Sequence, residues 1–174
     1  MIQLVLSSTP VDEVPGKLVL ATFFEDVRPL KGVVGLLDWR LNGHLSRLIM
    51  AERISGGFSE SLIMPSRGRV AADEILLFGL GSYKTASEDE LEKGFDCIVD
   101  KVARLGAPTF VISFGEMARD FMSWRALLRS FMGGLSQRIR KEDIQMFCAE
   151  DSRWIQEARR RNMDFGADVE LTYA

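Results

Sequence analysis

Residues 74–84, with the sequence EILLFGLGSYK, decide the fold class of this chain. The apolar run 75–78 leads directly into Gly79 and Gly81, a pattern typical of a buried strand that enters a tight turn. A dinucleotide-binding turn needs a third glycine, in the spacing G-x-G-x-x-G, just before a helix whose amides receive the phosphates. Lys84 stands at that third position, so the motif fails where the helix must pack closely on the strand.

The helix expected after this turn begins late and brings its own negative charge. Ser87 and Glu90 have the spacing of a capping box, which places the first helical turn at residues 88–90. The carboxylates of that turn complement the helix dipole and would repel a phosphate that approached the same amides. We therefore interpret the turn as a strand-to-loop connection without a ligand. The alternative is a phosphate site in which Arg67, Arg69 and Lys84 converge from neighbouring loops.

Strand and helix patterns alternate outward from this stretch. Short apolar runs predict six strands, at residues 2–6, 17–24, 61–64, 75–78, 109–114 and 144–148. Apolar residues at three- and four-residue spacing predict helices over 36–53, 87–105 and 118–139, and a further helix capped by Ser152. The alternation predicts an α/β fold with a largely parallel sheet covered on both faces. No linker divides the chain, so residues 1–174 are expected to form a single domain.

The composition is that of an ordinary globular protein. The chain has 174 residues, of which 47% are hydrophobic and 27% are charged. A net charge of -3 makes nucleic acid an unlikely partner, because phosphate binding needs clustered Lys and Arg in excess of nearby acids. No apolar run approaches the roughly 18 residues of a membrane helix, and the N-terminus has no basic region of a signal peptide. We expect a cytoplasmic protein with no membrane partner.

Candidate functional residues are few. His44 is the only histidine, and Cys97 and Cys148 form no CxxC pair, so we predict no catalytic residue, no metal site and no cofactor. Glycine and basic residues in the predicted loops form the candidate ligand-binding set: Arg67, Arg69, Gly79, Gly81, Lys84 and Gly115.

An ordered series of motifs carries a family resemblance. It begins with an LD…L-x-G-x-L-S-R-L helix over residues 37–48, followed by Gly56-Gly57 ahead of a strand that ends at Pro65. The strand and turn over 75–81 come next, and then V-I-S-F-G-E-M at 111–117 before a long helix. Together these motifs resemble the N-terminal domain of the leucyl aminopeptidase family of cytosolic metallopeptidases, peptidase family M17. The resemblance covers nearly the whole chain.

The resemblance implies a fold but does not imply a catalytic site. It implies a macro-domain-like three-layer α/β/α sandwich with a mixed, mostly parallel six-stranded sheet. In that family the metal ions, the catalytic lysine and the N-T-D-A-E-G-R-L signature belong to a separate C-terminal domain, and the signature is absent from this sequence. No catalytic residue is therefore carried over, and we do not expect aminopeptidase activity from this chain. ADP-ribose-binding macro domains carry N-A-A-N and G-G-G-V motifs, and neither is present.

Two functional hypotheses follow. The first is a non-catalytic, stand-alone relative of the leucyl aminopeptidase N-terminal domain that acts in oligomer assembly or regulation through protein contacts. Members of the family assemble as hexamers, so the expected partners are a second copy of the chain or a full-length aminopeptidase. The helix 118–139 carries more apolar residues than one face needs; we favour its full burial against the sheet, and the alternative is that it leaves a patch for a partner. The second hypothesis is a module that binds a small anionic, nucleotide-like metabolite at the strand ends.

Overall fold

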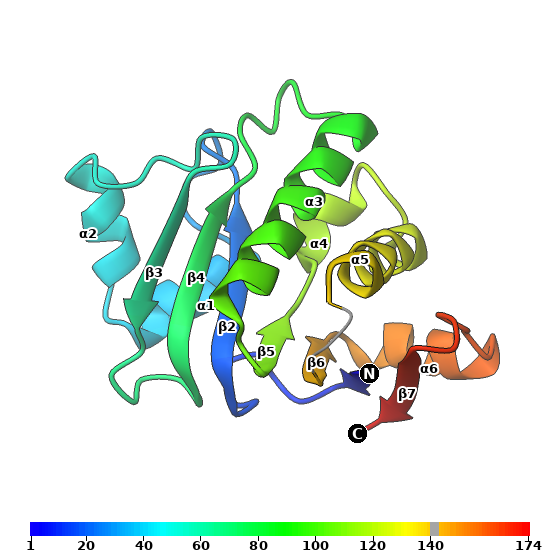
Figure 1. The fold of residues 1–174 in the computed structure, drawn as a ribbon. Helices are drawn as coiled ribbons and strands as arrows, with labels where there is room; N and C mark the ends of the chain where they lie inside the picture. The colour runs from blue at the N-terminus through cyan, green and yellow to red at the C-terminus, as the bar shows by residue number, and fades with distance from the viewer. Residues whose placement is uncertain (140–142) are drawn as a thin grey trace.

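One mixed sheet organises the molecule. The computed structural model describes residues 1–139 and 143–174, and of residues 116 and 117 it describes the backbone alone. The described residues form a seven-stranded sheet in the order β3-β4-β2-β5-β6-β1-β7 (Figure 1). β3 is antiparallel to β4, and every other neighbouring pair is parallel.

The elements alternate along the chain as the sequence predicts. The strands are β1 Ile2–Ser7, β2 Gly16–Phe23, β3 Ser61–Pro65, β4 Ala72–Gly79, β5 Thr109–Ile112, β6 Ile144–Ala149 and β7 Val169–Tyr173. The helices are α1 Gly32–Arg40, α2 His44–Met50, α3 Glu88–Leu105, α4 Gly115–Arg119, α5 Trp124–Arg138 and α6 Ser152–Arg160. None of the helices in this described part has the length and apolar character that a membrane span requires.

The seventh strand corrects the expected count of six. β7 pairs in parallel with β1, with Val169 opposite Ile2, and forms one edge of the sheet. Its sequence, VELTY, alternates half-buried with exposed residues. A short edge strand of this kind lacks the continuous apolar run that marks the central strands.

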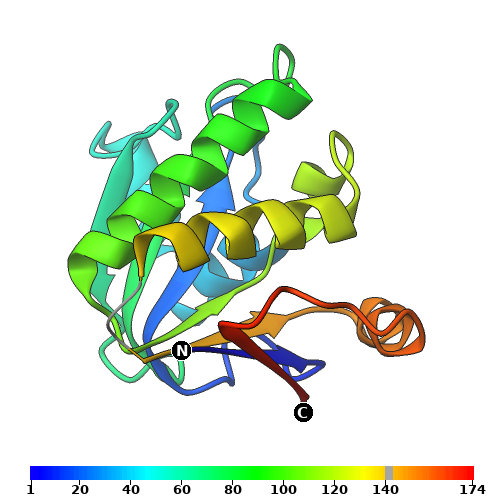
Figure 2. The ribbon, with the colours of Figure 1, turned by 45° about the vertical axis from the view of Figure 1, so that its right-hand side comes forward.

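Alternating residues of the central strands feed two separate cores. Leu18, Leu20 and Phe78 belong to a core under α3, α5 and α6, whereas Val19 and Leu77 belong to a core under α1 and α2. Side chains of successive strand residues point to opposite faces, which explains this division. The result is the expected three-layer α/β/α sandwich, in which α3 and α5 lie side by side over one face (Figure 2).

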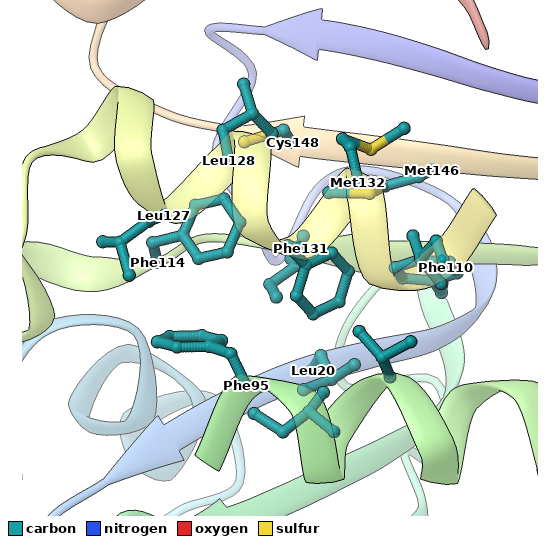
Figure 3. Close-up of a cluster of buried hydrophobic side chains, with 14 of the residues drawn as sticks. Leu20, Phe95, Phe110, Phe114, Leu127, Leu128, Phe131, Met132, Met146 and Cys148 are labelled. Atoms are coloured by element: carbon teal, nitrogen blue, oxygen red, sulfur yellow. The ribbon is translucent and has the colours of Figure 1, made fainter. Parts of the chain in front are cut away.

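The long helix expected over residues 118–139 is two helices, and its apolar face is buried. Ser123 begins α5 by accepting a hydrogen bond from the N–H of Ala126. The ring of Phe131 packs 6.3 Å from that of Phe95 on α3 and 5.7 Å from that of Phe114 after β5 (Figure 3). The favoured interpretation, burial of this helix, is therefore confirmed, and no patch is left by its apolar residues Trp124, Leu127, Leu128, Phe131, Met132 and Leu135.

A left-handed turn also divides the helix expected over 36–53. Asn42 and Gly43 have φ values of 54° and 73°, which an α-helix cannot contain. α1 ends before them and α2 starts directly after them. The break lets Leu37 and Leu45 both reach the core, and it leaves Trp39 and Met50 on the outside.

Candidate functional site

The six candidate ligand residues lie at two opposite ends of the strands; below, these two sides of the sheet are called the carboxyl-terminal edge and the opposite edge, as distinct from the edge strands β3 and β7. The parallel strands β4, β2 and β5 all end at one edge, where ligands of open α/β sheets usually bind. Gly79 is the last residue of β4, and Gly81, Lys84 and Gly115 lie in the chain just after the ends of β4 and β5. Arg67 and Arg69 lie in the turn between β3 and β4, at the opposite edge. The length of β4 separates the two groups, so Arg67, Arg69 and Lys84 do not converge.

Asp26, in the loop after β2, occupies the amide donors that follow Gly81. Its carboxylate accepts hydrogen bonds from the N–H of Tyr83 at 2.7 Å, the hydroxyl of Ser82 at 2.8 Å and the N–H of Lys84 at 3.1 Å. Desolvation raises the pKa of this carboxyl, but the hydrogen bonds, led by that from Tyr83, outweigh it and lower the pKa to about 2. A carboxylate of the protein thus stands where a phosphate of a ligand would bind.

Gly79 is required by a neighbouring loop. A Cβ on Gly79 would lie 2.2 Å from the backbone oxygen of Gly57 and 2.5 Å from the carbonyl carbon of Gly56. The N–H of Gly81 donates to the oxygen of Gly56 at 2.9 Å. The glycines of the opening motif therefore let two stretches of backbone approach closely.

The Gly56-Gly57 loop is occupied in the same way. One oxygen of Glu60 accepts from the N–H groups of Ser55, Gly56 and Gly57 at 2.9, 2.8 and 3.2 Å. Desolvation raises the pKa of Glu60, but these hydrogen bonds and the one from the Ser55 hydroxyl lower it overall. The amide donors of this loop are satisfied within the domain.

Glu150 fills the third loop, after β5. Its carboxylate accepts from the N–H of Phe114 at 2.8 Å and from the hydroxyl of Ser113 at 3.2 Å, and it pairs with the guanidinium of Arg119. Burial raises the pKa of the Glu150 carboxyl, while Arg119 and the two hydrogen bonds oppose that rise. Sequence reasoning missed Glu150, although a carboxylate directly after an apolar strand is a signal that it shares with Asp26.

A cavity of about 410 Å³ opens beside Glu150, at the ends of β1, β5 and β6. Its lining includes Gly115, Arg119, Glu150 and Asp151. Two carboxylates therefore face the cavity against one guanidinium. Its electrostatics disfavour a polyanion, because the only arginine in the lining is already paired.

A second cavity, of about 370 Å³, lies at the opposite edge and has the opposite charge. We name it the arginine pocket; it is lined by Leu41, Asn42, His44, Arg47, Met64, Pro65, Ser66, Arg67 and Arg69. No carboxylate is among these lining residues. The structure thus brings Arg67 and Arg69 together with Arg47 and His44, a grouping that the sequence did not indicate.

Arg67 has an unusual backbone conformation. Arg67 and Gly68 have φ values of 53° and 71°, and the N–H of Arg69 donates to the oxygen of Ser66 at 3.1 Å. Positive φ at both central residues is the pattern of a type I′ hairpin turn, where Asn, Asp and Gly are favoured at the first position. An arginine there costs about 1 kcal/mol in backbone strain.

The described residues contain no group of three or more His, Cys, Asp or Glu side chains arranged to hold a metal ion. His44 lies half-buried at the start of α2, where it lines the arginine pocket.

Comparison with known structures defines the class of fold. A Trypanosoma brucei macrodomain in complex with ADP-ribose aligns with a TM-score of 0.69 at 14% identity, covering 91% of this chain and 69% of that one. A macrodomain of Thermus aquaticus DarG gives 0.66 at 13% identity, covering 86% and 99%. A tomato leucine aminopeptidase mutant gives 0.61 at 18% identity, covering 92% of this chain and 35% of that one. The fold is therefore that of a macrodomain.

The chain belongs to the cytosol aminopeptidase family, because residues 19–136 match the N-terminal domain of that family. A probable cytosol aminopeptidase of Sulfurihydrogenibium sp. is 28% identical over 130 residues, which are 75% of this chain and 25% of that protein. A probable cytosol aminopeptidase of Alkaliphilus metalliredigens is 27% identical over 96 residues, which are 55% of this chain and 19% of that protein. The match thus spans a quarter or less of these relatives. The family expected from the sequence motifs is confirmed.

Proposed function

We propose that this domain acts through protein contacts, in assembly or regulation, and performs no chemistry of its own. The observation that carries the proposal is the exposure of large apolar side chains on the first two helices. Trp39 on α1 is 69% exposed, and Met50 on α2 is 75% exposed. Trp, Met and Arg are enriched in protein interfaces relative to the rest of the surface.

The side chain of Trp39 has a local partner that suits an interface. The guanidinium of Arg40 lies 5.0 Å from the centroid of its ring. Arg40 is itself held by Asp12, whose carboxylate accepts from Nε at 2.6 Å. The tryptophan is therefore presented beside an anchored cation, and a partner that covers both would gain apolar contact without having to order a free arginine.

The satisfied loops at the other edge support the same proposal. Asp26, Glu60 and Glu150 each accept from backbone amides that would otherwise face a ligand. A ligand phosphate would have to displace a carboxylate of the protein at each place. This requirement favours a role in contacts over one in metabolite binding.

The partner we propose is a second copy of this chain or a full-length cytosol aminopeptidase, in the cytoplasm. The family relationship supports this choice, because the matched relatives are named cytosol aminopeptidases and exceed the matched region about fourfold in length.

Light scattering coupled to size exclusion tests the proposal. The chain is measured alone and then mixed with a full-length cytosol aminopeptidase from the same organism. We expect a defined oligomer or a mixed complex that is lost in the double variant Trp39→Ser/Met50→Ser. The matched control is Leu105→Ser, at the far end of α3, where an apolar side chain is 46% exposed. A monomer that ignores the enzyme would overturn the proposal.

Binding of a small anionic metabolite beside Arg119 is the second candidate. The size and position of the cavity of about 410 Å³ and the likeness to a macrodomain in complex with ADP-ribose favour it, whereas the pairing of Arg119 with Glu150 counts against it. A ligand at about 100 times its dissociation constant adds about 2.7 kcal/mol to stability, which a thermal-shift assay detects. An unchanged melting temperature with ADP-ribose, ADP and AMP would eliminate this candidate.

A further inference from the structure

The arginine pocket is built for a carboxylate that carries apolar carbon. Arg47, Arg67 and Arg69 supply its positive charge, while Leu41 and Met64 supply apolar surface. Arg47 is oriented by a hydrogen bond of 2.7 Å from Nη1 to the oxygen of Asn42. Within residues 1–139 and 143–174, the guanidinium groups of Arg67 and Arg69 have neither an ion pair nor a hydrogen bond. Guanidinium groups bind carboxylates through charge-assisted, often bidentate hydrogen bonds.

β3, which leads into this pocket, is an edge strand with free backbone groups. The ladder to β4 includes bonds from the N–H of Gly79 to the oxygen of Glu60 and from the N–H of Ser66 to the oxygen of Asp73. Because antiparallel pairs alternate, the backbone groups of Ser61 and Ile63 and the carbonyl of Pro65 point away from β4.

Pro65 supports this orientation of the edge. A proline in a strand is placed where its missing N–H would have faced solvent. The side chain of Ile63 is 44% exposed, so the free edge also carries apolar surface. An added strand would find backbone partners along β3 and positive charge at its end.

We propose that the β3 edge and the arginine pocket together bind an acidic segment of a partner protein, which adds to the sheet as an extended strand. One or more of its carboxylates bind among Arg47, Arg67 and Arg69. The proposal rests on the proposed function, because it names the chemistry of a partner for a domain that works through protein contacts.

The conformation of Arg67 argues that its side chain is kept for binding. It occupies the turn position where Asn is favoured, so an asparagine would adopt this positive φ with less backbone strain than an arginine does. A strained residue that nothing in the fold requires points to a role in recognition. The substitution Arg67→Asn therefore separates binding from folding.

A protein segment fits this site better than a nucleic acid. The chain has a net charge of -3, and Arg47, Arg67 and Arg69 gather in one pocket. A polyphosphate backbone needs cations along an extended path, whereas one or two carboxylates need a single cluster. The apolar lining and the free strand edge also match a peptide.

Fluorescence anisotropy with a defined peptide tests the proposal. The probe is an end-capped, fluorescein-labelled peptide of alternating Glu and Val, and the control peptide replaces Glu by Gln. We expect binding of the Glu peptide that weakens as salt is added, and binding of the Gln peptide that is about tenfold weaker or more. Equal binding of both peptides, or no binding of the Glu peptide at about 1 mM, would overturn the proposal.

Variants of the full chain locate the site. The double variant Arg67→Asn/Arg69→Asn is expected to weaken binding about tenfold or more while the melting temperature holds or rises. The matched control Arg104→Asn/Arg160→Asn, in the last turns of α3 and α6, also removes two positive charges and is expected to bind as the wild type does. Ile63→Pro removes an outward N–H from β3 and is expected to weaken binding without unfolding the domain. Unchanged peptide binding in the Arg67→Asn/Arg69→Asn variant would refute the proposed site.

A competition experiment determines whether the site prefers the carboxylates of a peptide or the phosphates of a nucleic acid. A short single-stranded oligothymidylate that bound more tightly than the peptide, through the same arginines, would overturn the proposal in favour of a nucleic-acid site. The light-scattering test of the proposed function uses no peptide and varies Trp39 and Met50. Assembly of the wild-type chain without peptide binding would thus refute this inference alone, whereas a wild-type chain that neither self-associates nor binds the enzyme would refute the proposed function.

Discussion

The carboxylate of Asp26 accepts a hydrogen bond of 2.7 Å from the backbone N–H of Tyr83, 57 residues further along the chain. The contact joins the loop after β2 to the loop after β4, and it is possible because these strands are neighbours in the sheet. Through this contact and those from Ser82 and Lys84, donors that follow the Gly-x-Gly turn are bound by a carboxylate of the protein itself.

The Asp26 contact predicts a specific pH dependence. Because the folded pKa of Asp26 is lowered to about 2, its stabilising effect is fully present above the unfolded value of about 4 and is lost as the pH falls toward 2. We expect Asp26→Asn to melt at a lower temperature than the wild type at pH 7, and the difference to shrink between about pH 4 and pH 2. Asp168→Asn, on an exposed aspartate, is the control and should show no such convergence. A constant gap across this pH range would contradict the assignment.

Alanine substitutions at Gly79 and Gly133 should change stability in opposite directions, because only Gly79 is packed closely against another part of the backbone. Gly79→Ala is expected to lower the free energy of unfolding by about 2 kcal/mol or more, because its Cβ would collide with the backbone of Gly57. Gly133→Ala meets no atom within 4 Å in α5, so it should raise stability by about 0.5–1 kcal/mol. Urea denaturation measures both, and similar effects of the two substitutions would refute the packing role of Gly79.

Features that depend on residues close together in the sequence could be predicted, whereas contacts between distant loops could not. The capping of α3 by Ser87 and its end at Gly106 are local, and both are confirmed by the N–H of Glu90 donating to Ser87 Oγ and by a φ of 58° at Gly106. The carboxylates that fill the loops were missed because strand order decides which loops meet. Hydrophobic periodicity reports which residues are buried and leaves that order open.

Removing the Glu150 carboxylate should be strongly destabilising. Glu150→Ala leaves the half-buried guanidinium of Arg119 and the N–H of Phe114 without their acceptor, which should cost about 3 kcal/mol. Glu170→Ala, on an exposed position of β7, should change stability by less than about 0.5 kcal/mol. Chemical denaturation at neutral pH compares the two, and equal losses would show that the ion pair contributes little.

The burial of α5 predicts a large effect in the core. Phe131→Ala is expected to cost about 3–5 kcal/mol, because the ring is 1% exposed and packs against Phe95, Phe110 and Phe114. Phe58→Ala removes a ring that is 48% exposed and should cost much less. If Phe131→Ala left stability unchanged but altered oligomeric state, α5 would be a contact surface after all.

The loop carboxylates also bear on how easily this framework changes its role. In each of these loops the backbone donors are bound by a carboxylate of the domain itself, so the hydrogen bonds of the loop require no contribution from a small molecule. Conversely, the negative charge that closes each loop comes from one side chain: Asp26, Glu60 or Glu150. A few substitutions at these positions would free the backbone N–H groups while the strand pairing stays the same. The same fold can thus change between a domain that binds proteins and one that binds a small anion through few substitutions.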